Sequence, residues 1–565
     1  MEIEQRQPVS AGAGGAVPAG PGPAEPVGPR CPEPSGPRRS PFTRRALIAA
    51  VAGCAVLGGA LALWPSSGQG GAPPPAAGPV ARAVTAVGAG VPAALPDLAA
   101  LIEDREARVR ARPRDDRSWA VLGAAYTERA RRTAVAAYYP KAERALRTSL
   151  TVRPKGNAEA LEGLAALAVA RGDFRAAKQW GEAALKLAPK RWTTYSSLLD
   201  AYTGLGDHKA TRKALDRLLA LGSGSGPGAR AVTASAYQDL GRREDAAAVI
   251  SDAAAGAATP AERAAFLDRA GDLAWERGDL QESLDHYRAA VNTDADEHGA
   301  SAGQGRALAG LGRVPEAVAA YRAALAARPT PRHALELGEL YEKLGLDGAA
   351  RTQYDQVREL VRRDTGAGMN DELVLGLLEA DHGDPRAAVR ALRAEWRRHP
   401  GIAVADALGW ALHRAGDDGE ALEFATRTMD GEHGGEVRSA LYAYHRGQIE
   451  RDLGLSGPAR RHLAEALRIN PSFSPLLAPA AREALAALGE PPPGGPPEES
   501  AGSGDTGDAE AAGDADRSGR SEGSVGTRGA AGAPRSAPTG SPGAAVAPYA
   551  PELLAPSFPL PSAAR

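Results

Sequence analysis

The sequence predicts an all-α protein: a right-handed superhelical solenoid of about ten antiparallel helix hairpins, flanked by disordered tails. Glycine recurs along the middle of the chain in steps of 33 to 38 residues, at Gly172, Gly206, Gly241, Gly278, Gly312, Gly345, Gly383, Gly416 and Gly454. A period near 34 residues is typical of stacked helical hairpins. Between these glycines the apolar residues follow helical spacing, whereas both ends of the chain are rich in Gly, Pro, Ala and Ser.

Composition divides the 565 residues into five segments. We expect residues 1–43 to be a disordered cytoplasmic segment, 44–65 to form a transmembrane helix or signal anchor, and 66–94 to be a Pro- and Gly-rich linker. The helical repeats occupy 95–489, and residues 490–565 form a second disordered tail. The apolar end of that tail, from Tyr549 to Leu560, is either a short docking motif or merely the end of the chain.

The stretch Ala46–Trp64 contains nineteen residues and no charge. As a helix it would rise about 28 Å, close to the thickness of the hydrocarbon layer. Four arginines precede it within residues 38–45, and the next basic residue is Arg82. The positive-inside rule therefore places the N-terminus in the cytoplasm and the repeats outside it.

Two other fates of this stretch stay open. Arg44-Arg45 begins a pattern that resembles a twin-arginine export signal, and Ala60-Leu61-Ala62 offers a cleavage site, so the protein could be secreted. Cys54 ends a sequence that resembles a lipobox, so the protein could be a lipoprotein, although the apolar run continues for ten residues beyond it. All three interpretations place the repeats outside the cytoplasm.

The segment Ser301–Pro329 shows the repeat pattern most clearly. Gly305 and Ala317 are small where the two helices of a hairpin must cross closely, and Tyr321 is large enough to fill the gap toward the next hairpin. Gly312 can adopt the positive φ that ends a helix, and proline stops the second helix because its ring cannot continue the hydrogen-bond ladder.

These residues resemble the tetratricopeptide repeat family, and we expect a bacterial, membrane-anchored protein of that family. A second close match has Leu337, Gly338, Tyr341, Gly345, Ala350 and Tyr354. The resemblance covers ten units over about 390 residues, with a short helix before them (Asp97–Ala111) and one after them (Pro479–Leu488) that caps the stack. The first unit departs from the family by about seven extra residues around Arg131–Tyr139. The run Gly222–Gly228 predicts a flexible joint.

In this family the first helix of each hairpin lines a concave groove. Carried over residue by residue, the resemblance implies that the groove is lined by Glu159, Glu162, Asp200, Asp268, Asp272, Trp275, Arg306, Glu339, Glu342, Trp410, His413, Tyr444, Gln448 and Arg451. This set suggests an acidic groove with an aromatic, more basic end, suited to an extended peptide that carries basic residues. Charged helix faces are also common without any ligand, so that alternative stays open.

Composition disfavours other classes of function. The net charge of −2 gives no basic field for nucleic acid, and Cys31 and Cys54, the chain's two cysteines, lie outside the repeats. No phosphate loop, nucleophile elbow or metal-ligand spacing occurs, so we expect no enzyme activity, no cofactor and no metal. The Lys and Asn pattern of the family's carboxylate clamp is missing. The sequence therefore predicts a non-catalytic, membrane-anchored scaffold in the bacterial envelope that binds proteins or extended peptides; the alternative is a regulatory or assembly subunit of an envelope enzyme complex, such as cytochrome maturation or cell-wall synthesis.

Overall fold

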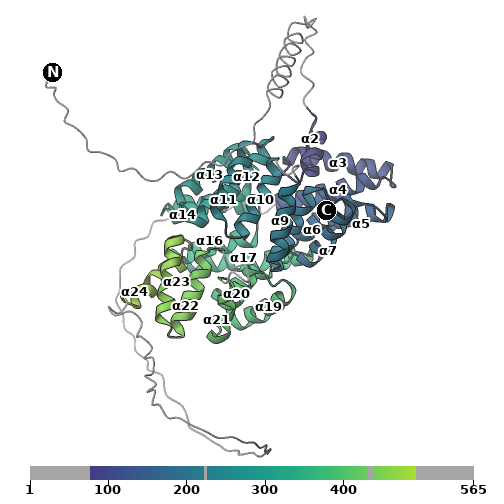
Figure 1. Cartoon of the computed structure of the whole chain (residues 1–565). Helices are drawn as coiled ribbons and strands as arrows, with labels where there is room; N and C mark the ends of the chain where they lie inside the picture. The colour runs from purple at the N-terminus through teal and green to yellow at the C-terminus, as the bar shows by residue number, and fades with distance from the viewer. Residues whose placement is uncertain (1–76, 222–225, 430–436, 491–565) are drawn as a thin grey trace, which may run out of the picture. The chain divides into compact units, whose positions relative to one another are not determined.

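The computed structural model describes residues 77–221, 226–429 and 437–490. These residues form 23 α-helices and no strand, labelled α2 to α24 as in Figure 1. Two helices, α2 (Pro79–Gly88) and α3 (Leu95–Ala111), precede ten consecutive hairpins, and α24 (Leu477–Ala487) follows them. The all-α prediction is confirmed for this part of the chain.

The two helices of each hairpin follow one another directly in sequence. The hairpins are α4 (Asp116–Thr133) with α5 (Tyr138–Val152), α6 (Ala158–Ala170) with α7 (Phe174–Leu187), α8 (Trp192–Gly204) with α9 (His208–Ala220), α10 (Pro227–Asp239) with α11 (Arg243–Ala255), α12 (Pro260–Arg277) with α13 (Leu280–Thr293), α14 (His298–Gly310) with α15 (Val314–Ala327), α16 (Pro331–Lys343) with α17 (Asp347–Gly366), α18 (Glu372–His382) with α19 (Pro385–Arg398), α20 (Ile402–Arg414) with α21 (Asp418–Arg427), and α22 (Ala440–Asp452) with α23 (Ser456–Ile469). In the first hairpin the unusual stretch lengthens α4 to Thr133, and Ala134 then takes a left-handed conformation with φ 52°.

Small residues let the helices of a hairpin approach each other. A Cβ atom built on Gly305 of α14 would lie 2.7 Å from the ring of Tyr321 on α15, and the same clash arises between Gly338 of α16 and Tyr354 of α17 at 2.5 Å. Both tyrosines are buried. The small and large positions in the sequence therefore correspond to real contacts between paired helices.

Eight of the nine periodic glycines have a positive φ, between 65° and 88°. At Gly172-Asp173 and Gly206-Asp207 the aspartate side chain accepts the backbone N–H of the residue three positions further on and so caps the second helix. Gly383 is the exception, with φ −145° and ψ −128°. A Cβ atom at Gly383 would clash with the side chain of Glu379, and the Glu379 carboxylate accepts the backbone N–H of Asp384 at 3.3 Å.

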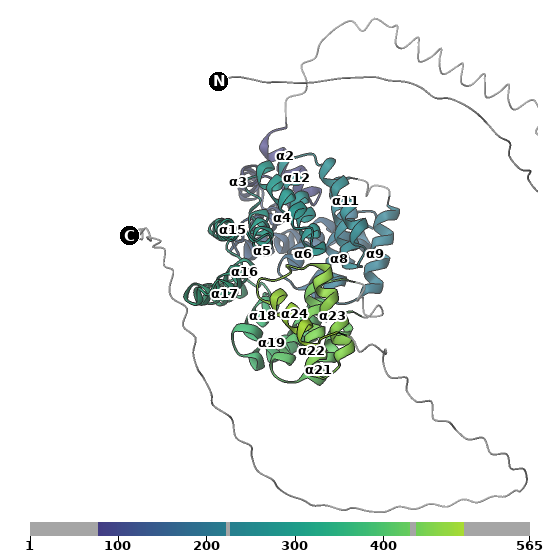
Figure 2. The same cartoon turned by 90° about the vertical axis from the view of Figure 1, so that its left-hand side faces the viewer.

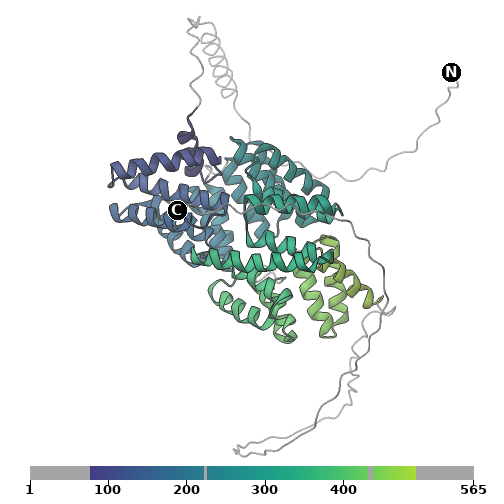
Figure 3. The same ribbon diagram turned by 180° about the vertical axis from the view of Figure 1, so that it is seen from behind.

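Contacts between hairpins far apart in sequence draw the solenoid closed. The backbone N–H of Asn370, after α17, donates to the carbonyl of Arg171 at 2.8 Å, and the amide of Asn470, after α23, donates to the carbonyl of Trp275 at 2.7 Å. The carbonyl of Pro400 touches Gly206. In Figure 3 the N-terminal hairpins, in blue, lie beside green helices from the later part of the chain, and Figure 2 shows the molecule after a quarter turn. The repeat pattern did not predict this closure, because a periodic signal identifies each hairpin but not which distant hairpins meet.

Helix α2 corrects the interpretation of residues 66–94 as a linker without helix. Pro79 lies in the first turn of α2, where its missing N–H costs nothing. Ala83 and Ala86 are buried in one cluster with Leu98 and Leu101 of α3 and with Ala125 of α4. Packing therefore stabilises a ten-residue helix that is too short to be stable alone.

Several predictions fall outside the described residues. The expected transmembrane segment 44–65 and both expected tails lie there, and within the described ranges no helix is both long and apolar enough to cross a bilayer. Residues 222–225 of the predicted joint also lie outside, whereas Pro227 and Gly228 already belong to α10.

Candidate functional site

The expected groove residues lie on the first helices of their hairpins, and three cavities of the described domain are lined mainly by first helices. Twelve of the fourteen expected residues line these three cavities, whereas Trp275 and Arg306 line none of them. Their role in binding remains a prediction, but their surroundings differ sharply.

The largest of these three cavities, of about 660 Å³, lies among α2, α4, α6 and α8. Glu159, Glu162 and Asp200 line it. Glu162 pairs with Arg191 at 2.5 Å, and Glu159 accepts from Arg153 at 2.8 Å, so neither carboxylate is free. Burial within the surrounding helices raises the pKa of Asp200 to about 6, although its side chain is open to the cavity.

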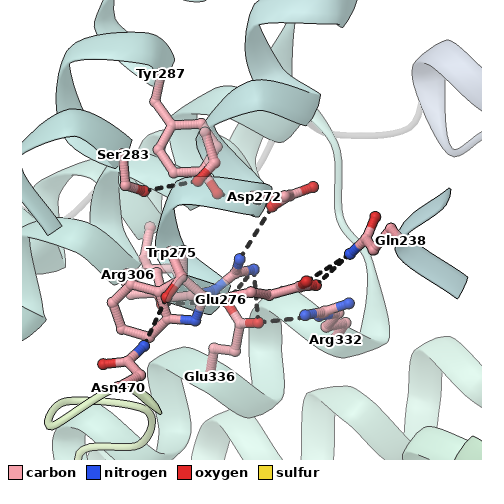
Figure 4. Close-up of polar contacts among 12 residues, drawn as sticks. Gln238, Asp272, Trp275, Glu276, Ser283, Tyr287, Arg306, Arg332, Glu336 and Asn470 are labelled. Atoms are coloured by element: carbon pink, nitrogen blue, oxygen red, sulfur yellow. Dashed lines mark hydrogen bonds and ion pairs between the residues drawn. The ribbon is translucent and has the colours of Figure 1, made fainter. Parts of the chain in front are cut away.

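The middle of the expected groove is closed by an internal ion-pair ladder (Figure 4). Arg306 of α14 reaches Asp272 of α12 at 3.3 Å and Glu336 of α16 at 2.9 Å. Its guanidinium carbon lies 5.9 Å from the ring centre of Trp275. Asp268 lines a second cavity of about 490 Å³, where burial and the nearby Asp272 raise its pKa well above the usual value. Asp272 and Arg306 therefore satisfy each other and leave little for a ligand.

The third cavity, called here the C-terminal pocket, has a volume of about 290 Å³ and brings seven expected residues together. Its lining consists of Glu339 and Glu342 from α16, Asp381 and His382 from α18, Trp410, His413 and Arg414 from α20, Tyr444, Gln448, Arg451 and Asp452 from α22, and Leu476 and Leu477 at the start of α24. Four consecutive first helices thus contribute to one pocket.

Aromatic rings form the floor of the C-terminal pocket. Trp410 and Tyr444 are each only 3 % exposed, so they do not project into open solvent. The Trp410 indole stacks on the His445 ring with 4.2 Å between ring centres, and its N–H donates to Asp381 at 3.0 Å. His445 in turn contacts the buried Asp406 at 3.0 Å. These contacts hold the floor in one conformation.

Every cationic side chain of the C-terminal pocket is already paired. Arg414 pairs with Asp381 at 3.3 Å and Arg451 with Asp452 at 2.8 Å. The two histidines are similarly engaged, since His382 contacts Glu342 at 3.1 Å and His413 contacts Asp418 at 2.6 Å.

Glu339 is the one pocket carboxylate without a hydrogen bond or ion pair to any described residue. Burial raises its pKa to about 8, with further contributions from the negative charges of Asp381, Glu336 and Glu342. Gln448 is 6 % exposed; its amide N–H donates to the Tyr444 hydroxyl at 3.0 Å, but its carbonyl oxygen Oε1 has no partner within the described ranges. The pocket therefore presents two unsatisfied acceptors.

Sequence reasoning missed Asp381, Arg414 and Asp452, although a signal was present. Each stands five residues after the small residue of its first helix, which is Gly376, Gly409 or Gly447. The positions carried over from the family ended one residue earlier, so the last turn of these helices was overlooked. Over the described ranges, no group of three or more His, Cys, Asp or Glu side chains could hold a metal ion.

Comparison with known proteins supports the repeat assignment. Residues 303–365, which span most of α14 to α17, match the family described as tetratricopeptide repeat. No curated protein matches the chain.

Two solved structures show a weak likeness to this chain. A tetratricopeptide repeat protein from Parabacteroides merdae is 17 % identical, with a TM-score of 0.28, covering 46 % of this chain and 97 % of that one. The Cut9–Hcn1 hetero-tetramer of the APC/C is 15 % identical, with a TM-score of 0.30, covering 69 % of this chain and 92 % of that one. TM-scores this low do not establish a shared arrangement of the helices.

Proposed function

We propose that this chain is a non-catalytic protein-binding scaffold, anchored to the membrane by Ala46–Trp64, whose repeat domain lies outside the cytoplasm and captures peptides or protein segments on its first helices. One observation carries the binding role: the C-terminal pocket gathers side chains from four first helices, buries Oε1 of Gln448 without a partner, and leaves the partly buried Glu339 without a partner among the described residues. Buried polar groups in folded proteins are nearly always paired, so an unpaired one in a concave site marks a place for a ligand or a water molecule. The tetratricopeptide match at residues 303–365 supports protein binding in general terms.

Site-specific photo-crosslinking tests the binding role. A photoreactive amino acid at Arg414, which lies at the rim of the C-terminal pocket, is compared with one at Arg390, which is exposed on α19 and lines none of the three cavities described above. We expect protein adducts from position 414 and none, or far fewer, from position 390. Equal adducts from both positions would contradict a binding role for the pocket.

The same experiment separates the scaffold from the second candidate, a regulatory or assembly subunit of an envelope enzyme complex. Mass spectrometry of the adducts would identify many unrelated extended segments for a general scaffold. A small set of stoichiometric enzyme partners would favour the second candidate. We propose no nucleic-acid partner, because the net charge of −2 provides no phosphate-binding field.

Membrane topology needs its own measurement. Alkaline phosphatase fused after Gly78, just before α2, should be active if the repeats lie outside the cytoplasm. A matched fusion after residue 43 should be inactive. Activity of the second fusion with inactivity of the first would reverse the proposed orientation. Mass determination of the mature N-terminus then distinguishes a retained anchor from a cleaved signal or a lipid attached at Cys54.

A further inference from the structure

The groups of the C-terminal pocket without a protein partner are an amide oxygen and the Glu339 carboxyl, which becomes a pure hydrogen-bond acceptor once it is ionised. Glu339 has no partner, and Oε1 of the nearly buried Gln448 has none, whereas no buried side-chain donor of the pocket lacks an acceptor over the described ranges. Arg414 and Arg451 already pair with Asp381 and Asp452, and among the described residues neither donates to Glu339 or to Oε1 of Gln448. The chemistry that completes the pocket must therefore bring donors and positive charge.

The size and lining of the pocket narrow the ligand further. A volume of about 290 Å³ suits a side chain or a very small molecule and not a folded element. Leu476 and Leu477 add apolar surface beside the acceptors. Long cationic side chains combine these requirements, because their methylene stems pack on apolar surface while their charged ends form hydrogen bonds.

We propose that the C-terminal pocket binds an arginine side chain of a protein partner, with the guanidinium group donating to Glu339 and to Oε1 of Gln448. This inference rests on the proposed protein-binding function. Arginine is favoured over lysine because Glu339 on α16 and Gln448 on α22 belong to different helices. A planar guanidinium has five donors in a fixed fork and can reach two acceptors at once, whereas an ammonium is a compact point charge.

The 490 Å³ cavity gives no comparable indication. It contains unsatisfied donors, Nη1 of Arg132 and Nε of Arg328, together with unsatisfied acceptors on Glu128 and Asp371. Water can satisfy such a mixed set without any preference for a ligand. The one-sided set of acceptors distinguishes the C-terminal pocket.

Binding of blocked amino acids to the full chain tests the proposal. Isothermal titration would use N-acetyl-arginine amide, the matching lysine compound, and the citrulline compound, which is neutral but similar in shape to arginine. We expect arginine to bind at least tenfold more tightly than citrulline and measurably more tightly than lysine. Equal binding of arginine and citrulline would overturn the role of charge, and equal binding of lysine would overturn the guanidinium assignment.

Two variants assign the binding to the pocket. Glu339→Gln should weaken arginine binding roughly tenfold, whereas Glu423→Gln, which removes an exposed carboxylate on α21, should leave it unchanged. Circular dichroism of each variant confirms its fold. An unchanged affinity in folded Glu339→Gln would show that arginine binds elsewhere.

The pH dependence of binding provides a readout that a structural role would not produce. Glu339 is surrounded by Asp381, Glu336, Glu342, Tyr321 and Tyr354, and its pKa of about 8 means that a bound cation must displace a proton at neutral pH. Arginine affinity should therefore rise about tenfold between pH 7 and pH 9, and this rise should vanish in Glu339→Gln.

The outcomes keep the two proposals separate. If arginine does not bind but position 414 still crosslinks to proteins, the arginine inference fails and the scaffold function stands. If neither is observed, both fail.

Discussion

Replacement of Gly206 by alanine tests how the solenoid closes on itself. Gly206 has φ 65° and a Cβ atom there would lie 2.4 Å from the carbonyl oxygen of Pro400, which begins the approach to α20. Gly312 provides a matched control, because its φ is 75° and a Cβ atom there would meet nothing within 4 Å. Both substitutions place an alanine in the same left-handed turn of the repeat, and only Gly206→Ala disturbs a contact between distant hairpins.

The expected magnitudes differ for a physical reason. An alanine forced into the left-handed region costs about 1 kcal/mol, which is the whole effect expected for Gly312→Ala. In Gly206→Ala the carbonyl of Pro400 must also move by about 0.9 Å to reach a normal carbon–oxygen contact of about 3.3 Å. Overpacking of this kind typically costs a further 1 to 3 kcal/mol, so a total of about 2 to 4 kcal/mol is expected.

Thermal unfolding and hydrogen exchange measure the difference. The midpoint of Gly206→Ala should lie clearly below that of Gly312→Ala, and amides at residues 399–403 should exchange faster only in Gly206→Ala, nearly 200 residues from the substitution. Repeat proteins need not unfold in one step, so the local exchange is the more decisive measurement. Equal midpoints together with unchanged exchange at 399–403 would refute the closed arrangement.

Three further predictions concern buried polar groups. Burial alone would raise the pKa of Glu336, but Arg306 and Arg332 outweigh it and hold this pKa at about 2. Because that value lies below the unfolded pKa of about 4.3, Glu336 stabilises the fold above pH 4.3, and this stability is lost as the pH falls toward 2. Glu336→Gln should therefore cost about 3 kcal/mol at pH 7 and much less at pH 2.5. If the unfolding midpoints of the variant and the original protein differed equally at both pH values, this reasoning would be wrong. The pKa of Glu339 is shifted in the opposite direction, to about 8, so its carboxyl destabilises the fold increasingly from pH 4.3 to pH 8. Glu339→Gln should therefore raise the stability by up to about 5 kcal/mol at pH 9 and hardly at pH 4. A lower unfolding midpoint of the variant at pH 9 would show that Glu339 has a partner. The side-chain amide of Asn370 donates to Glu395 at 2.7 Å, beside the loop that contacts Arg171. Asn370→Ala should therefore cost about 1 to 3 kcal/mol of stability and speed hydrogen exchange at residues 171–175. Unchanged exchange at these residues would disprove the prediction.

The order of helices in the repeats could be predicted from the sequence because it depends on local chemistry. Gly312 ends a helix wherever it occurs, since it tolerates a positive φ, and Gly305 opposite Tyr321 specifies a close crossing within about sixteen residues. The same reasoning placed seven residues of the C-terminal pocket correctly on first helices, from Glu339 to Arg451. It failed for α2, where proline and glycine suggested a linker, because burial of Ala83 and Ala86 against α3 and α4 depends on helices elsewhere in the chain.

The sequence by itself determined the repeat, the helix ends and the face of each hairpin that carries Asp272, Arg306 and Glu339, because these depend on neighbours within one or two turns. Only the tertiary structure decided which of these charges remain without a partner. Arg306 closes the middle of the face by pairing with Asp272 and Glu336, while Glu339, one turn from Glu336 on the same helix, is left unpaired. Charge pairing is set by distances across hairpins, and those distances depend on the stacking of the hairpins.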